Sequence, residues 1–341
     1  MGYDYARRLR LQPEEYQYRP LMRQKVEYVF VDHGFFRLRA LYPDDHLHAF
    51  NLFMVVFAKL LTIYGFYHIF AYQRYISLFL VFTLKIVSLI GNTVGCHRMW
   101  SHRAFDAHWS LRVFLMIAYC FTAQGSLFEW SRGHRLHHKF TDTDSDPNNP
   151  RRGLWYAHIG WFLKTEHPDV ARAEAKLTVD DVWADPIVRF HHQNNNLLTY
   201  LMMIASIAMH YVLVGDTLLE SILFLILRIN MSLHAEVMIN SAAHLFGNRP
   251  YKPECSATEH WFVSIGALGE GCHNYHHKFP YDYRTGEGVQ FGHNYTHSFI
   301  VVCIWLGLIY NLRHASDNLI RITVENARQR TAGEEWSNIS K

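Results

Sequence analysis

The sequence has few charged residues and few cysteines for its length. Asp, Glu, Lys and Arg make up 18% of its 341 residues, whereas soluble globular domains contain about a quarter. The five cysteines have no CxxC or disulfide-like spacing, which is typical of a reducing compartment. The net charge is only +3 and no Pro-, Gly- or Ser-rich linker divides the chain, so nothing predicts nucleic-acid binding or separate soluble domains. Because 50% of the residues are hydrophobic, a disordered protein is excluded.

Four apolar runs, each of about 20 residues, are long enough to cross a membrane. They form two pairs with short polar turns between the partners, which predicts two helical hairpins. The runs cover residues 52–72, 75–96, 197–214 and 218–239. Polar side chains in the last run are expected to face the bundle interior rather than lipid. These are Arg228, Asn230, His234 and Glu236. Two further apolar runs, 113–123 and 299–310, are too short to span and are expected to lie along the interface.

The basic residues show which side the polar segments occupy. Of the 33 Lys and Arg, 29 fall in the three segments that a four-span topology places on one side, residues 1–51, 97–196 and 240–341. The positive-inside rule makes that side cytosolic, and both termini with it. We therefore expect an all-α integral membrane protein with a cytosolic helical cap. The expected parts are a cytosolic N-terminal segment (1–48), a membrane domain (49–311) with its cap at 97–196 and 240–298, and a cytosolic tail (312–341).

Histidine is abundant, with 24 residues concentrated in short clusters. Two clusters repeat the spacing i, i+3, i+4, which places three imidazoles on one face of a helix, and a third has the spacing i, i+5. Eight side chains exceed what one tetrahedral metal can use, so two metals are expected. Imidazole suits zinc, copper, iron or nickel, and the chain has no HExxH motif of a metalloprotease. A carboxylate-poor pair of irons at a membrane is an oxygen-activating arrangement. The clusters are His97 and His102; His134, His137 and His138; and His273, His276 and His277.

The segments around these histidines resemble the membrane fatty acyl-CoA desaturases of the stearoyl-CoA (Δ9) type. The similarity extends from Asp45 to Tyr310. It is carried by HRMWSHR (97–103), EWSRGHRLHHKF (129–140), NSAAHLFG (240–247) and GEGCHNYHHKFPYDY (269–283).

The resemblance implies a ninth histidine ligand, His244, and a contribution of Asn240 through a water molecule. It implies that one iron takes His97, His102, His134, His138 and His277, and that the other takes His137, His244, His273 and His276. It also implies O₂ as cosubstrate, a fatty acyl-CoA as substrate, and an endoplasmic reticulum location. No Rossmann glycine motif or haem-binding segment is present, so electrons must come from a separate donor. In the family this is cytochrome b5 with its reductase.

The resemblance also assigns residues to the substrate, namely Trp130, Arg132, Arg135, Lys85 and Leu89. The last two fall at the methyl end of the acyl tunnel, where a leucine in place of a smaller residue would shorten it. Several positions that contact the CoA head in the family differ here: Gly125, Gly133, Thr165 and Glu166. The sequence leaves open whether head-group binding is weakened, because an added acid opposes a polyanion, or whether the contacts have moved.

The expected activity is therefore the introduction of a cis double bond, at Δ9, into a saturated acyl chain. Three alternatives remain. They are a lipid hydroxylase with the same metal centre, a non-catalytic lipid-binding relative, and a zinc-dependent membrane hydrolase. The remaining histidines, including His158 and His234, are not expected to bind metal.

Overall fold

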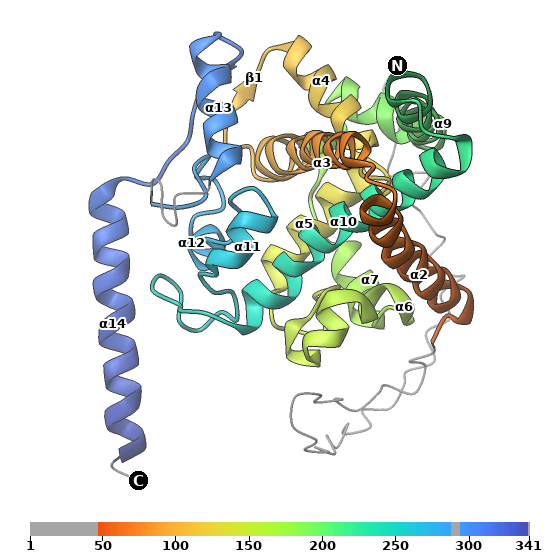
Figure 1. The fold of residues 1–341 in the computed structure, drawn as a ribbon. Helices are drawn as coiled ribbons and strands as arrows, with labels where there is room; N and C mark the ends of the chain where they lie inside the picture. Colours follow the sequence, from red (N-terminus) through yellow and green to blue (C-terminus); the bar gives the residue numbers. More distant parts are fainter. Residues whose placement is uncertain (1–46, 288–293, 340–341) are drawn as a thin grey trace, which may run out of the picture.

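The structure is a computed structural model that describes residues 47–287 and 294–339. The predicted N-terminal segment, 1–48, therefore lies almost entirely outside the described residues. The described chain is helical, which confirms the expected fold class (Figure 1). Its two short strands, β1 (Asp106–Ala107) and β2 (Ile309–Tyr310), pair antiparallel and join the cap to the C-terminal region.

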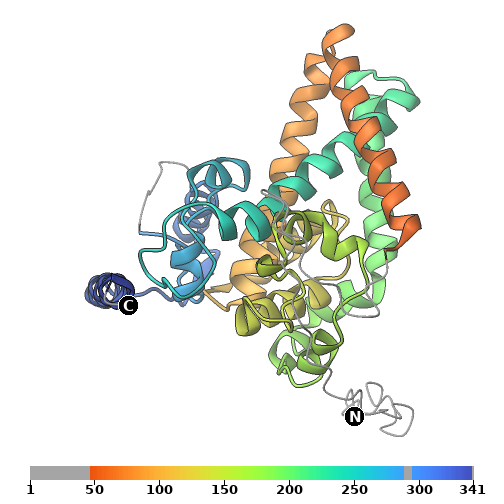
Figure 2. The same ribbon diagram turned by 90° about the horizontal axis from the view of Figure 1, so that it is seen from below.

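Four helices within the described residues are long and apolar enough to cross a membrane, as predicted. In Figure 2 they extend together to one side of the molecule, while the shorter helices gather at the other end. They are α2 (Ala49–Ala71), α3 (Tyr75–Ile90) continued by the π-helical η1 (Gly91–Ser101), α9 (Pro186–Ala208) continued by η4 (Met209–Val214), and α10 (Leu218–Leu245).

The third of these helices begins earlier than the apolar run at 197–214 predicts. It starts at Pro186, where the side chain of Asp185 accepts a hydrogen bond from the backbone N–H of Ile187. A capping aspartate followed by proline is a strong start signal. The polar stretch between Pro186 and Leu197 is helical but too hydrophilic for a hydropathy window to include it.

Helix α10 packs against both α2 and α3. Its apolar contacts include Phe224 and Leu227, which are fully buried against Ile69 and Val81. Its polar residues turn inward, as expected: Arg228 is buried and donates to the carbonyl of Phe121 at 2.6 Å. The predicted inward orientation is therefore confirmed for this arginine, and Asn230 and Glu236 are buried as well.

The cap helices surround one end of these four helices, and the cytosolic location of that end stays a prediction. Its largest apolar core joins η1 to α4 (Trp109–Cys120) and α5 (Leu127–Phe140). Gly91 makes this approach possible, because a Cβ there would lie 2.2 Å from the backbone nitrogen of Tyr119. The other cap elements are η2 (Pro150–Arg152), η3 (Tyr156–Gly160), α6 (Trp161–Leu163), α7 (Pro168–Glu174), α8 (Asp180–Trp183), α11 (Trp261–Gly266) and α12 (His273–Lys278).

The two short apolar runs form helices that are too short to span, α4 and α13 (Tyr295–Trp305). The predicted tail is largely one helix, α14 (Asp317–Ile339), which stands at the side of the molecule (Figures 1 and 2).

Candidate metal centre

Four helical elements bring nine histidines together beneath the membrane helices. In each of two groups, the candidate ligand nitrogens all lie within 4.8 Å of one another. The first group consists of His97, His102, His134, His138 and His276, and the second of His137, His244, His273 and His277. The structure thus assembles all nine predicted histidines into two potential metal sites.

Helices α5 and α12 each contribute to both groups. On α12, His273 and His277 are one turn apart and their Nε2 atoms lie 3.1 Å from each other. The Nε2 atom of His276 instead lies 2.9 Å from that of His97 and 2.9 Å from that of His138. The expected assignment of His277 to the first group and His276 to the second is therefore wrong. His273 and His277 are spaced i, i+4 and therefore lie in one row along the helix, whereas His276 points toward the other site.

The i, i+5 pair depends on the π-helical turn at the end of the second span. The backbone N–H of His102 donates to the carbonyl of His97 at 3.1 Å, which is the hydrogen bond of a π turn. The two rings lie with their centroids 5.0 Å apart. An α-helix stacks residues three or four apart, not five, so the π turn makes this spacing usable.

The donor set fits transition-metal ions. The ligand nitrogens face one another without an intervening acid, and burial lowers the pKa of six imidazoles outside the spans, which keeps them neutral and able to coordinate. These are His102, His134, His138, His273, His276 and His277. The buried Nε2 atom of His137 has no hydrogen-bond partner among the described residues, as expected for a nitrogen reserved for a metal.

Polar side chains contact the Nδ1 atoms of three candidate ligand rings. Glu270 lies 3.2 Å from Nδ1 of His97 and is itself paired with Arg98 at 2.7 Å. The side chain of Asp146 lies 2.9 Å from Nδ1 of His137. The hydroxyl of Ser256 lies 2.7 Å from Nδ1 of His244. Such partners fix ring orientation and raise ligand basicity.

Sequence reasoning did not assign these positioning roles. Glu270 precedes His273 in an E-x-x-H pattern, but its carboxylate faces His97 and Arg98 from another element. That interaction lowers the pKa of Glu270 to about 2, against the opposing effect of its burial. Its contact with His97 spans more than 170 residues of sequence, so no local spacing signals it.

The predicted substrate residues of α5 lie close to the metal centre. The ring of Trp130 stacks on His134 with centroids 4.9 Å apart. Arg132 forms an ion pair with Glu174 at 2.7 Å. Arg135 donates two hydrogen bonds of 2.7 Å to Asp181. Both arginines therefore have protein partners, and their contact with substrate stays a prediction.

The remaining predicted residues lie on the spans. Leu89 is fully buried against Ala235 and Leu268, and Nζ of Lys85 lies 3.4 Å from the carbonyl of Gly266. Asn240 lies one turn before His244 on α10, which puts both on one helical face. Its contribution through a water stays a prediction, as do the tunnel roles of Lys85 and Leu89.

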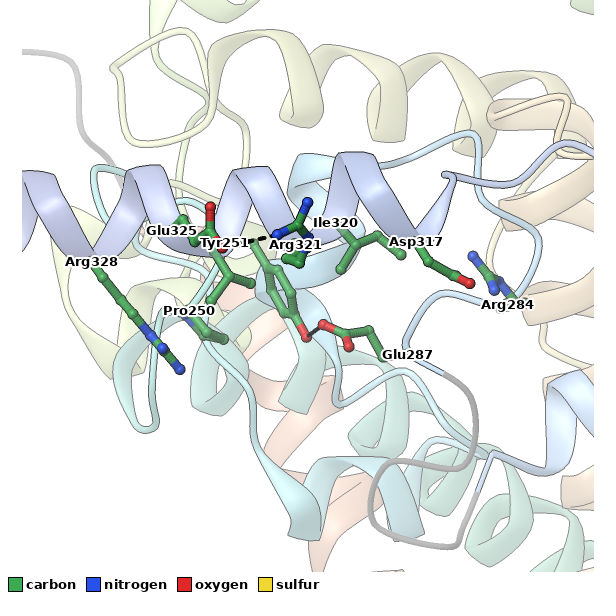
Figure 3. Close-up of a pocket in the computed structure, with 10 residues that line it drawn as sticks. Pro250, Tyr251, Arg284, Glu287, Asp317, Ile320, Arg321, Glu325 and Arg328 are labelled. Atoms are coloured by element: carbon green, nitrogen blue, oxygen red, sulfur yellow. Dashed lines mark hydrogen bonds and ion pairs between the residues drawn. The ribbon is translucent and has the colours of Figure 1, made fainter.

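A cavity of about 630 Å³ lies away from this centre, beneath α14 (Figure 3). Tyr251 and Glu287 point toward each other across it and form a hydrogen bond. None of its lining residues is a candidate metal ligand, so it is not the reaction site. The lining residues are Pro250, Tyr251, Arg284, Glu287, Asp317, Ile320, Arg321, Val324, Glu325 and Arg328.

We predict that acid destabilises this centre. The unfolded chain protonates its histidines near pH 6.5, whereas burial in the folded chain lowers the pKa values of the six imidazoles named above, that of His273 to about 3. Below about pH 6.5 the unfolded state therefore binds more protons, and stability falls as the pH drops toward the folded values. The thermal midpoint of the metal-free protein and the metal content of the loaded protein should both fall between about pH 8 and about pH 5. A midpoint that does not change over this range would contradict the assignment.

Comparison with known proteins identifies the class. The family model for fatty acid desaturase matches residues 74–291, which include all nine histidines. The chain is 40% identical over 273 residues to stearoyl-CoA desaturase 5 of Bos taurus, covering 79% of this chain and 81% of that protein. It is 37% identical over 277 residues to an acyl-CoA Delta12-desaturase of Acheta domesticus, covering 81% and 78%. It is 35% identical over 298 residues to an acyl-CoA Delta(11) desaturase of Choristoneura rosaceana, covering 84% and 88%.

A four-span helical membrane protein with two histidine-lined metal sites is the architecture expected of this group. The chain belongs to the fatty acid desaturase family. Within that family it belongs with the membrane acyl-CoA desaturases, and it is an enzyme of that group.

Proposed function

We propose that this enzyme introduces a cis double bond, at Δ9, into the saturated chain of a fatty acyl-CoA. It uses O₂, two iron ions and electrons from cytochrome b5 and its reductase. It works in the endoplasmic reticulum membrane with both termini and the cap in the cytosol. One observation carries the proposal: nine histidines form two adjacent groups at the ends of four apolar helices. The relatives named as acyl-CoA desaturases support the substrate class.

The nine histidines would hold the iron pair, and the side chains of Glu270, Asp146 and Ser256 fix three of their rings. When bound, the irons would supply the oxidising power needed to remove hydrogen from an unactivated methylene. Most of the ligand rings are buried, which excludes bulk water and protects against side reactions. Trp130, stacked on His134, provides an apolar wall beside the centre. The protein's main task is orientation, because two carbons must be selected from a uniform chain.

The relatives and the residues around Arg132 bear on the regiochemistry and the head group. The positional names among the relatives include Δ11 and Δ12. Two carboxylates lie near Arg132. Glu174 pairs with it, and burial and Glu174 raise the pKa of the second, Glu166. This arrangement favours moved head-group contacts over a site identical to that of the family.

Expression in a cell that lacks its own Δ9 desaturase tests the proposal directly. The double bonds in the lipids of that cell should appear at Δ9 of saturated chains, and a variant with His137 replaced by alanine should give none. Double bonds at another position would overturn the Δ9 assignment alone. Hydroxylated lipids in place of unsaturated ones would favour the hydroxylase, which shares the same ligands. The absence of both products would favour a lipid-binding role.

We predict that Leu89→Ala shifts substrate preference toward longer acyl chains. Each additional methylene that fits contributes about 0.8 kcal/mol, or about fourfold in preference. Competition between palmitoyl and stearoyl substrates measures the shift. Leu227→Ala is the matched control, since Leu227 is equally buried but packs against Ile69 and Phe224. An unchanged product ratio in Leu89→Ala would show that this residue does not border the acyl chain.

A further inference from the structure

Helix α12 carries three of the nine candidate ligands but is only six residues long, His273–Lys278. No side chain caps its N-terminus, and isolated helices this short are unstable in water. Its position and rotation must therefore be fixed by contacts with other parts of the chain. The rotation matters, because it turns His273 and His277 toward one site and His276 toward the other.

Asn274 links α12 to the loop formed by residues 251–258. Its Oδ1 atom accepts hydrogen bonds from the backbone N–H groups of Tyr251 at 2.9 Å and Lys252 at 3.1 Å. Its Nδ2 atom donates to the carbonyls of Lys252 at 3.0 Å and Ala257 at 2.8 Å. An asparagine amide has two donors and two acceptor positions, and all four are used here. The side chain is 0% exposed, so water does not compete for these bonds.

The same loop contacts the end of α10, which carries His244. The hydroxyl of Thr258 donates to the carbonyl of Ala243 at 2.9 Å, and the backbone N–H of Thr258 donates to the same carbonyl at 2.7 Å. The hydroxyl of Ser256 lies 2.7 Å from Nδ1 of His244. The loop therefore holds both the helix and the imidazole ring of this candidate ligand.

A third connection leads from the loop to His137 on α5. The backbone N–H of Ser256 donates to Oδ2 of Asp142 at 2.8 Å. The backbone N–H of Asp142 donates to Oδ2 of Asp146 at 3.4 Å, and Oδ1 of Asp146 lies 2.9 Å from Nδ1 of His137. Two aspartates thus connect the loop to this ring.

These contacts converge on only one of the two histidine groups. The loop reaches every candidate ligand of the second group, two of them through α12 and the other two through Ser256 and the aspartates. Of the first group it reaches only His276, which shares α12. The other four ligands of that group lie on η1, at its C-terminal end and on α5, where Glu270 contacts His97 instead.

We propose that the 251–258 loop, linked to α12 by Asn274, positions the second histidine group for its metal ion. Asn274, Ser256 and Thr258 are positioning residues, because none of them is a candidate ligand. Loss of a residue that orients a ligand costs about 10–100-fold in metal affinity. This inference rests on the proposed function, in which the histidines hold two metal ions, and it adds that the two sites depend on different parts of the chain.

The test measures the binding of Zn²⁺ to each site separately in the metal-free protein. In one background the first group is disabled, and in the other the second group is disabled, by replacing all but two of its histidines with alanine. The replaced residues are His102, His134 and His138 in the first background, and His137 and His244 in the second. Asn274→Asp is then added to each background. Aspartate keeps the size of the side chain and its acceptor oxygen but cannot donate to the two loop carbonyls.

Where the second site is retained, Asn274→Asp should weaken Zn²⁺ binding by about 10–100-fold. Where the first site is retained, the loss should be much smaller, because only His276 of that group lies on α12. A merely structural role would loosen both sites alike. Equal losses in the two backgrounds would therefore overturn the proposal, and so would an unchanged affinity of the second site.

Ser256→Ala is a milder variant that removes only a hydroxyl, and it should weaken the second site in the same direction. Ser232→Ala is its matched control, since Ser232 is also buried but has its hydroxyl 3.0 Å from that of Ser88. It should leave the affinity of both sites unchanged, and a loss at the second site as large as that of Ser256→Ala would count against the loop. A wild-type protein that binds no Zn²⁺ at either group would instead contradict the proposed metal centre itself, and the role of the loop with it.

Discussion

Replacing His276 by alanine should remove activity and lower metal content without preventing membrane insertion. Its Nε2 atom lies 2.9 Å from those of both His97 and His138, so it is central to the first histidine group. Loss of a residue that only orients a ligand costs about 10–100-fold, so loss of a ligand should cost more than about 100-fold. Iron analysis and quantification of unsaturated lipid measure the two effects. His137→Ala should behave in the same way through the second group.

An exposed histidine outside both groups provides the control. His314 lies before α14 and is exposed, so His314→Ala should keep both its metal and its activity. If His276→Ala retained full activity, the assignment of this residue as a ligand would be wrong. Loss of iron in one variant and not in the other would show that the two sites are filled independently.

Replacing Arg98 by alanine should produce the largest loss of stability among single changes near the centre. Arg98 and Glu270 are 1% and 2% exposed and form an ion pair of 2.7 Å. Removing one partner leaves a buried charge uncompensated, which costs about 3–5 kcal/mol. Arg98 also donates to the carbonyl of Tyr283 at 2.7 Å, and that acceptor would lose a partner too. The thermal midpoint of the metal-free protein measures the loss.

A second variant separates charge from packing. Arg98→Met combined with Glu270→Gln removes both charges, so it should be more stable than Arg98→Ala although it lacks the same pair. Arg321→Ala is the exposed control. Its pair with Glu325 is 68% and 54% exposed, and such surface pairs contribute about 0.3–0.5 kcal/mol. Equal midpoints for Arg98→Ala and Arg321→Ala would contradict the predicted role of the buried pair.

The sequence predicts the features of this protein that depend on local periodicity. The apolar runs locate four spans, and the spacing i, i+3, i+4 correctly places His134, His137 and His138 on α5. It does not give the start of α9, because the helix extends through polar residues that a capping aspartate and Pro186 begin. It also does not reveal the π turn between His97 and His102.

Contacts between distant elements account for what the sequence does not show. The choice of His276 or His277 for a given metal depends on how α12 is rotated against α5. The pairing of Glu270 with His97, and of His158 with His234, joins residues more than 70 positions apart. Lys59 is a single charged residue in an apolar run, and only the packing of α2 on α10 reveals its neighbours.

The crossing of α5 and α12 between the two histidine groups has a consequence for how the protein acquires its metals. Each site draws ligands from both helices, so the first ion to bind fixes the distance and rotation between them. Because the first ion has already ordered the two helices, the second ion binds with a smaller loss of conformational entropy and therefore more favourably. We therefore expect cooperative loading, in which a titration of the metal-free protein passes from empty to doubly filled with little singly filled protein between.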